Sequence, residues 1–164
     1  FPDTESCDAL LKRAKWVGLT VQSNSANWGF NVATKWPRAD YVVVDENEAQ
    51  LAFHRREPGE RLGSRLQMAL GATLAAITLG HRGSVMISGD SIERIPALTD
   101  RAVDRLGAGD AFLSWTAPLA WAGAPVPLIG LVGSAAAALH VAKPGNPPLT
   151  KGEVLGFVKA MLTA

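Results

Sequence analysis

Residues 103–112 read VDRLGAGDAF, a run in which two glycines and a carboxylate precede an apolar segment. Gly107 and Gly109 flank a small residue and lead into a predicted helix. Backbone N–H groups at the start of that helix can therefore face a ligand with no side chain in the way. Because the helix dipole adds partial positive charge at the same point, the stretch predicts an anion site suited to a phosphoryl group.

Asp110 has two interpretations in this position. A carboxylate beside an anion site repels phosphate, yet it can take a proton from an attacking hydroxyl group. The alternative is a glycine turn in which Asp110 caps the helix, which is common in α/β proteins. Residues 107–110 alone do not decide between the two, because short glycine-rich patterns recur by chance.

The sequence on either side alternates between apolar strands and helices. The predicted strands cover residues 16–22, 40–45 and 73–79, and a hairpin covers residues 84–88 and 91–96. The predicted helices are residues 8–15, a segment from residue 46 to a stop at residues 58–59, residues 60–70, and three more that begin near residues 109, 127 and 151. This alternation predicts an α/β fold.

Length and charge narrow the class of protein. A chain of 164 residues with 48% hydrophobic residues predicts one α/β domain over residues 1–164. Its net charge of +1 provides no overall field to attract nucleic acid or an anionic membrane. Cys7 is the only cysteine and cannot form an internal disulfide, which favours a reducing compartment. We therefore expect a cytoplasmic protein with neither nucleic acid nor membrane as a partner.

One uncharged stretch, residues 111–139, is long enough to cross a bilayer. We expect it to be interrupted by Pro118, Gly123, Pro125, Pro127, Gly130 and Gly133. The alanine-rich segments on either side of residues 122–125 then predict two buried helices of a folded core rather than a membrane span.

Residues 103–112 and the small-residue helix after them closely resemble the C-terminal signature of the ribokinase-like (PfkB) family of carbohydrate kinases. Other matching segments follow in family order: VDENEA at 44–49, ITLGHRG at 77–83, and the alanines at 135–138 with KPGN at 143–146. No glycine-rich Walker loop indicates another phosphate-binding class. The resemblance implies the C-terminal portion of a ribokinase-like three-layer α/β/α sandwich, without the N-terminal half and its lid.

This resemblance implies an activity and a set of residues. The expected reaction transfers the γ-phosphoryl group of ATP, with Mg²⁺, to a hydroxyl of a sugar or sugar-phosphate. Asp110 is the expected general base, and the amides of Gly107, Ala108 and Gly109 are expected to stabilise the transferred group. The expected nucleotide contacts are Thr78, Gly80, Gly83, Ser134 and Asn146. The sequence of residues 24–31 resembles that of family members related to heptose-phosphate kinases and ADP-heptose synthesis.

Two further carboxylates are candidate metal ligands. Asp45 and Glu48 stand three residues apart at the start of a predicted helix, so both can face one side and hold a Mg²⁺. Asp45 replaces the asparagine usual in the family. The alternative is that both are ordinary helix-terminal acids favoured by the dipole. Asp104 matches a position where many relatives help to bind a monovalent cation, but Leu106 lacks the hydroxyl that relatives carry there, which weakens that expectation.

Other functions stay open at this point. The chain can be a nucleotide-binding fragment or subunit without catalysis of its own, which needs a complementing N-terminal half or a partner chain. It can also be a structural module in which residues 107–110 form a helix cap, and a homo-oligomer is compatible with any of these.

Two histidines and two asparagines complete the set of candidate polar residues. His54 and His140 have no ligand-type neighbour at metal-binding spacing, which predicts surface or core positions. Asn24 or Asn27, in the polar loop after the first strand, is a candidate ligand contact.

Overall fold

The computed structural model describes residues 4–23, 26, 28–99 and 102–163. Asn24 and Asn27 lie outside these residues. One sheet has the strand order β1-β2-β3-β4-β5. Its strands are β1 (Gly18–Thr20), β2 (Tyr41–Asp45), β3 (Leu74–Thr78), β4 (Ser84–Ser88) and β5 (Ser91–Ile95). The first three are parallel, and β4 and β5 extend the sheet in antiparallel fashion as the predicted hairpin.

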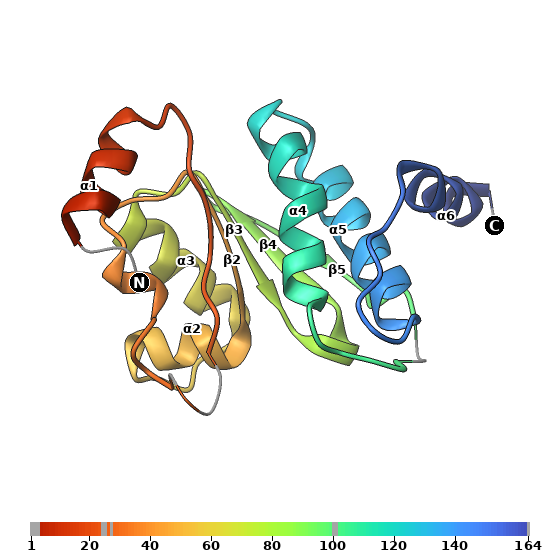
Figure 1. Ribbon diagram of the computed structural model, residues 1–164, viewed down its shortest axis with the longest axis horizontal. Coiled ribbons are helices and arrows are strands. Elements are labelled where there is room, and N and C mark those ends of the chain that lie inside the picture. The colour runs from red at the N-terminus through yellow and green to blue at the C-terminus, as the bar shows by residue number, and fades with distance from the viewer. Residues whose placement is uncertain (1–3, 24–25, 27, 100–101, 164) are drawn as a thin grey trace.

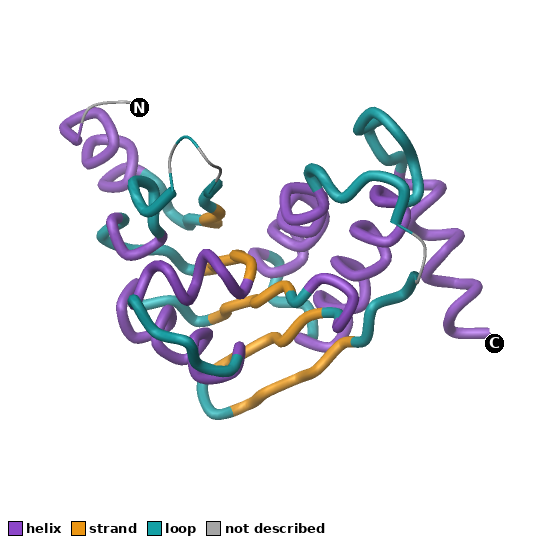
Figure 2. Tube along the Cα trace, turned by 90° about the horizontal axis from the view of Figure 1, so that it is seen from below, coloured by secondary structure: helices purple, strands orange, loops and turns teal. Residues whose placement is uncertain are grey.

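Helices cover both faces of this sheet, which confirms the predicted three-layer α/β/α fold (Figures 1 and 2). One layer holds α2 (Glu46–Phe53) and α3 (Gly59–Leu70), with α1 (Thr4–Arg13) beside it. The other holds α4 (Ala108–Trp121) and α5 (Val126–Val141), and α6 (Lys151–Thr163) packs outside α5. Two short 3-10 helices, η1 (Ala33–Lys35) and η2 (Gly80–Arg82), lie in connections.

The apolar run of β2 explains why the sheet needs two helical layers. Successive side chains of a strand point to opposite faces. Val42 and Val44 accordingly join the core under α2 and α3, whereas Tyr41 and Val43 join the core under α4 and α5. All four are at most 2% exposed, so either face left uncovered would expose a row of apolar side chains.

Two predicted boundaries are wrong. The first strand is three residues long instead of seven, because Val17 turns its N–H to the carboxylate of Asp40 (2.7 Å), and it stands at the edge of the described sheet. The helix α2 ends at Phe53, because His54 adopts a left-handed conformation with φ 51°. The predicted stop at residues 58–59 instead begins α3.

The uncharged stretch folds as two helices, α4 and α5, separated at residues 122–125 as predicted. Pro118, Gly130 and Gly133 do not interrupt them, contrary to expectation. Pro118 removes only the hydrogen bond to Ser114, and both residues are exposed, so water can satisfy the freed carbonyl. Within the described ranges, every helix is too short or too polar to cross a membrane.

We expect Gly133→Ala to destabilise the fold by about 1–3 kcal/mol, because a Cβ there would lie 2.6 Å from the Phe112 ring and 2.7 Å from Thr116. The matched control is Gly156→Ala on α6, where a Cβ meets open space and alanine raises helix propensity. Denaturant unfolding measures both variants. Equal midpoints would show that α4 and α5 do not depend on this close approach.

Candidate active site

Polar side chains lie in one row at the edge of the sheet where β2 and β3 end and β4 begins. Asp45 pairs with Thr78 across β2 and β3, and Thr78 pairs with Ser84 across β3 and β4. By strand alternation all three point toward the layer of α4 and α5, because Val44, Ile77 and Val85 at the adjacent positions belong to the opposite core. The structure therefore places a predicted metal ligand beside a predicted nucleotide contact.

Asp45 and Glu48 form a reciprocal capping box at the start of α2. The Asp45 carboxylate accepts from the Glu48 N–H (2.7 Å), and the Glu48 carboxylate accepts from the Asp45 N–H (3.0 Å). The second oxygen of Glu48 accepts from the N–H of Ser23, beyond β1 (2.9 Å). The alternative of helix-terminal acids is thus borne out by geometry, and it leaves Asp45 Oδ2 with no hydrogen bond among the described residues.

The charge of Asp110 reaches this pair. Burial raises the pKa of Glu48 above 4.5, two backbone hydrogen bonds oppose the rise, and the charges of Asp45 and Asp110 add to it. The start of α4 therefore lies within electrostatic reach of the start of α2. Three carboxylates from separate parts of the sequence share one region of negative potential.

The glycine turn ahead of α4 has the geometry of an anion site. Gly107 is left-handed, with φ 77°, and is the N-cap residue without a side-chain cap. The N–H of Ala108 lies a long 3.5 Å from the Arg105 carbonyl. The N–H groups of Gly109 and Asp110 have no partner within the described part of the chain, and a Cβ at Gly109 would meet open space. These amides are free for an anion.

Asp110 is not the helix cap. It is the third residue of α4, three positions after the cap, and its side chain is exposed. Its carboxylate makes no hydrogen bond or ion pair with any described residue, although its backbone carbonyl accepts from Ser114. The carboxylate therefore caps nothing and borders free amides, and its role as a base stays a prediction.

The two predicted nucleotide-side glycines differ in role. Gly80, with φ 60°, opens η2, and a Cβ there would meet nothing within 4 Å. Gly83 has φ 89°, and a Cβ there would lie 2.0 Å from the carbonyl oxygen of Ile95. The packing of β5 therefore already requires glycine at position 83. Ser84 follows it, 3% exposed, with a hydroxyl that has no partner.

The remaining predicted residues lie around the end of α5. The N–H groups of Val103 and Asp104 donate to the carbonyl of Val141 (2.7 and 3.1 Å), and the Asp104 carboxylate accepts from the Leu106 N–H (3.0 Å). Ser134 is 6% exposed within α5. Asn146, with φ 55°, directs its side chain at His140. No structural contact joins Asp104 to Asp45 or Glu48, and no group of three metal-ligating side chains occurs in the described ranges.

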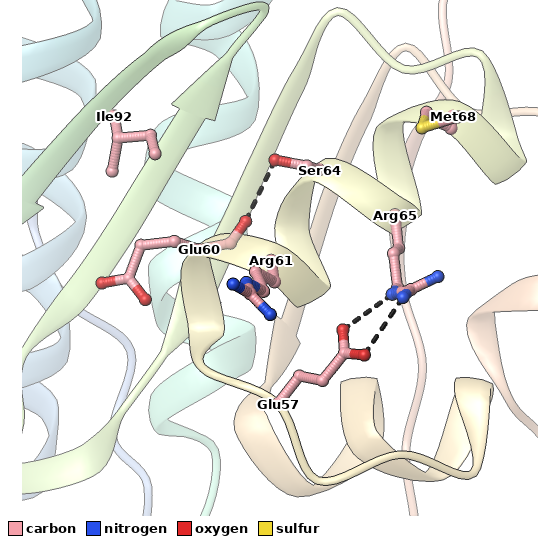
Figure 3. A pocket seen from close by; sticks show the side chains of 7 residues that line it. All are labelled: Glu57, Glu60, Arg61, Ser64, Arg65, Met68 and Ile92. Carbon is pink, nitrogen blue, oxygen red and sulfur yellow. Dashed lines mark hydrogen bonds and ion pairs between the residues drawn. The ribbon is translucent and has the colours of Figure 1, made fainter.

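A separate pocket of about 370 Å³ lies between α3 and β5, on the opposite face of the sheet from α4. Figure 3 shows its lining: Glu57, Glu60, Arg61, Ser64, Arg65, Met68 and Ile92. Arg65 donates twice to the Glu57 carboxylate, which lowers the pKa of Glu57. Arg94 binds the other lining carboxylate, Glu60, so both carboxylates of this pocket are already paired.

A sequence model of a protein family, described as pfkB family carbohydrate kinase, matches residues 6–149 of this chain. An ATP-dependent 6-phosphofructokinase of Thermoanaerobacterium thermosaccharolyticum is 36% identical over 77 residues, which cover 47% of this chain and 23% of that enzyme.

Solved structures share the fold. Ribokinase of Thermotoga maritima has a TM-score of 0.65 at 25% identity, over 74% of this chain and 42% of that one. Phosphofructokinase-2 of Escherichia coli has a TM-score of 0.69 at 15% identity, over 80% of this chain and 44% of that one. The chain therefore spans less than half the length of the relatives it matches.

The raised pKa of Glu48 predicts a pH effect on stability. Between 4.5 and the higher folded value the folded state binds more protons, so the contribution of Glu48 to the unfolding free energy falls as pH rises through this window. We expect the stability of Glu48→Gln relative to the parent to increase across the window and then to level off. Urea unfolding at several pH values measures it.

The matched control is Glu93→Gln on β5, which removes a carboxylate far from Asp45 and Asp110. A stability difference for Glu48→Gln that stays constant with pH would contradict the burial of its charge.

Proposed function

The chain belongs to the pfkB family of carbohydrate kinases, and from this premise we propose that it carries the nucleotide site and catalytic base of an ATP-dependent sugar kinase. The acceptor is a hydroxyl of a sugar or sugar-phosphate. The observation that carries the proposal is the unpaired carboxylate of Asp110 beside the free amides at the start of α4.

In the proposed reaction Asp110 accepts the proton of the sugar hydroxyl, and the hydroxyl oxygen forms a bond to the γ-phosphorus of ATP. The bond between that phosphorus and the β,γ-bridging oxygen breaks, and ADP leaves with the electron pair. The amides of Gly107, Ala108 and Gly109, together with that of Asp110, stabilise charge on the transferred group. The repulsion between Asp110 and phosphate is tolerable because these amides and the helix dipole offset it.

Asp45 and Glu48 fit a Mg²⁺ that keeps several waters. Among the residues that the structure describes, Asp45 Oδ2 accepts no hydrogen bond, and each Glu48 oxygen accepts one N–H. Burial is the main cause of the raised pKa of Glu48, and the charges of Asp45 and Asp110 add to it; a cation would offset the latter contribution. When bound, Mg²⁺ neutralises charge on the ATP phosphates. One Asp104 oxygen already accepts from the Leu106 N–H, and Leu106 offers no hydroxyl, which weakens the expectation of a monovalent cation at this position.

Thr78 and Gly80 are the proposed nucleotide contacts from the sheet edge, since Thr78 shares the row of Asp45 and Gly80 opens to space. Gly83, Ser134 and Asn146 complete the set by family resemblance. A link to heptose-phosphate kinases and a place in the cytoplasm are further parts of this proposal, as is assembly into a homo-oligomer.

A second candidate is a nucleotide-binding subunit that needs a complementing half for catalysis. The observation in its favour is β1, a three-residue edge strand that pairs with β2 and with no other described strand. An open edge next to the site can receive another strand. Nucleotide binding without transfer to any sugar would select this candidate.

We expect Mg²⁺–ATP to stabilise the chain, by about 2.7 kcal/mol at a concentration of 100 times Kd. The measurement is the melting temperature with ATP and Mg²⁺, against ATP with EDTA. Asp45→Asn with Glu48→Gln should reduce the Mg²⁺-dependent part. An unchanged melting temperature at millimolar Mg²⁺–ATP would contradict the proposed nucleotide site.

Asp110→Asn should lower kcat by about 10²–10⁴-fold, because the amide cannot accept the hydroxyl proton, while nucleotide affinity stays within about twofold. Phosphoryl transfer across a panel of sugars and calorimetric Mg²⁺–ATP binding measure the two effects. Asp90→Asn, in the turn between β4 and β5, is the control. Full activity of Asp110→Asn would refute the base assignment.

A further inference from the structure

His140 touches the anion-binding turn from a distant part of the sequence. Its Nε2 lies 3.0 Å from the carbonyl oxygen of Leu106, 34 residues away, in the residue just before Gly107. His140 belongs to the last turn of α5, so the side chain bridges the end of α5 and the start of α4. The sequence predicted only a surface or core histidine at this position.

The contact to Leu106 requires a protonated Nε2. A carbonyl oxygen only accepts, so this hydrogen bond forms in the tautomer that carries the proton on Nε2. The side-chain oxygen of Asn146 meets the same nitrogen. Asn146 reaches it because Gly145 and Asn146 are both left-handed, with φ 77° and 55°, which turns the chain back after α5. Two residues thus converge on one edge of the turn.

The same two side chains also pack against Gly107. A Cβ at Gly107 would lie 2.9 Å from His140 Nε2 and 2.9 Å from Asn146 Oδ1. The imidazole therefore occupies the side of Gly107 where any other residue would carry its side chain. Since Gly107 sets the direction of the N–H groups that follow, the position of the ring bears on the anion site itself.

Other hydrogen bonds hold the residues before and after the turn, including one from the Ala111 N–H to the Gly107 carbonyl (2.9 Å). The N–H groups of Val103 and Asp104 donate to the Val141 carbonyl, and the Asp104 carboxylate binds the Leu106 N–H. These hydrogen bonds hold the N–H groups of Val103, Asp104 and Leu106. The Leu106 carbonyl, whose peptide plane leads directly into Gly107, is held by His140.

We propose that His140 is a positioning residue: its Nε2–H holds the Leu106 carbonyl and thereby fixes the Gly107 turn so that the amides at the start of α4 point at the transferred phosphoryl group. Its effect on turnover rests on the proposed kinase function, whereas its effect on the turn does not. The ring acts through the backbone, because its contacts are with the Leu106 carbonyl and with Gly107 rather than with the amides of Gly109 and Asp110.

The test compares His140→Leu, which removes the donor, with His140→Gln, which keeps an N–H donor. His54→Asn, at the left-handed residue after α2, is the control for loss of a histidine. Amide NMR signals of residues 106–110 in the nucleotide-free chain report the conformation of the Gly107 turn. Kinetics with Mg²⁺–ATP and sugar read kcat and KM separately.

For His140→Leu we expect shifted amide signals at residues 106–110 and at least about tenfold faster hydrogen exchange at Leu106, whose N–H donates to the Asp104 carboxylate. We also expect kcat lower by about 100-fold, as for small misplacements of a catalytic group, with KM for ATP within about threefold. His140→Gln should restore most of both properties, and His54→Asn should change neither.

Unchanged amide signals and kcat in His140→Leu would overturn the proposal. A disturbed turn in a chain whose parent binds no Mg²⁺–ATP would uphold the positioning role and refute the kinase function instead. Should His140→Leu fail to fold, imidazole ¹⁵N couplings of the parent decide: a proton on Nε2 supports the bond to Leu106, and a proton on Nδ1 alone overturns it.

Discussion

The close approach of α4 and α5 is the constraint on which the site depends. Gly133 lets the ring of Phe112 and the methyl group of Thr116 sit against the backbone of α5. Thr116 also accepts the hydroxyl hydrogen of Tyr41 (2.9 Å) and donates to the Phe112 carbonyl (2.7 Å). This buried chain of hydroxyl groups fixes α4 on β2, and burial raises the pKa of Tyr41, so the phenol stays neutral.

That docking has an electrostatic consequence. With α4 fixed on β2, Asp110 comes within reach of Asp45 and Glu48, three carboxylates without a neighbouring Lys or Arg partner among the described ion pairs. The nearest described ion pair joins Arg82 to Glu46, on the other side of the first turn of α2. A folded chain that keeps such a group unneutralised stores repulsion that a bound cation would relieve.

Much of this arrangement follows from the sequence. The apolar run of β2, the hairpin of β4 and β5, and the glycine turn before α4 are local patterns, and each was predicted within a few residues. Gly83 was assigned to nucleotide binding, whereas the carbonyl of Ile95 already requires its glycine. The contact of His140 with Leu106 could not be predicted, because no periodicity or spacing relates the end of α5 to the turn before α4, 34 residues earlier in the sequence.

The bond between Tyr41 and Thr116 joins residues 75 apart, and this separation bears on the order of folding. The unit from β2 through β5 contains its own parallel pair, hairpin and covering helix α3, all closed by shorter loops. Because long loops cost more entropy to close, we expect that unit to form first and the layer of α4 and α5 to dock on it late. Asp110 then meets Glu48 only in the final step, so partly folded chains have no assembled site.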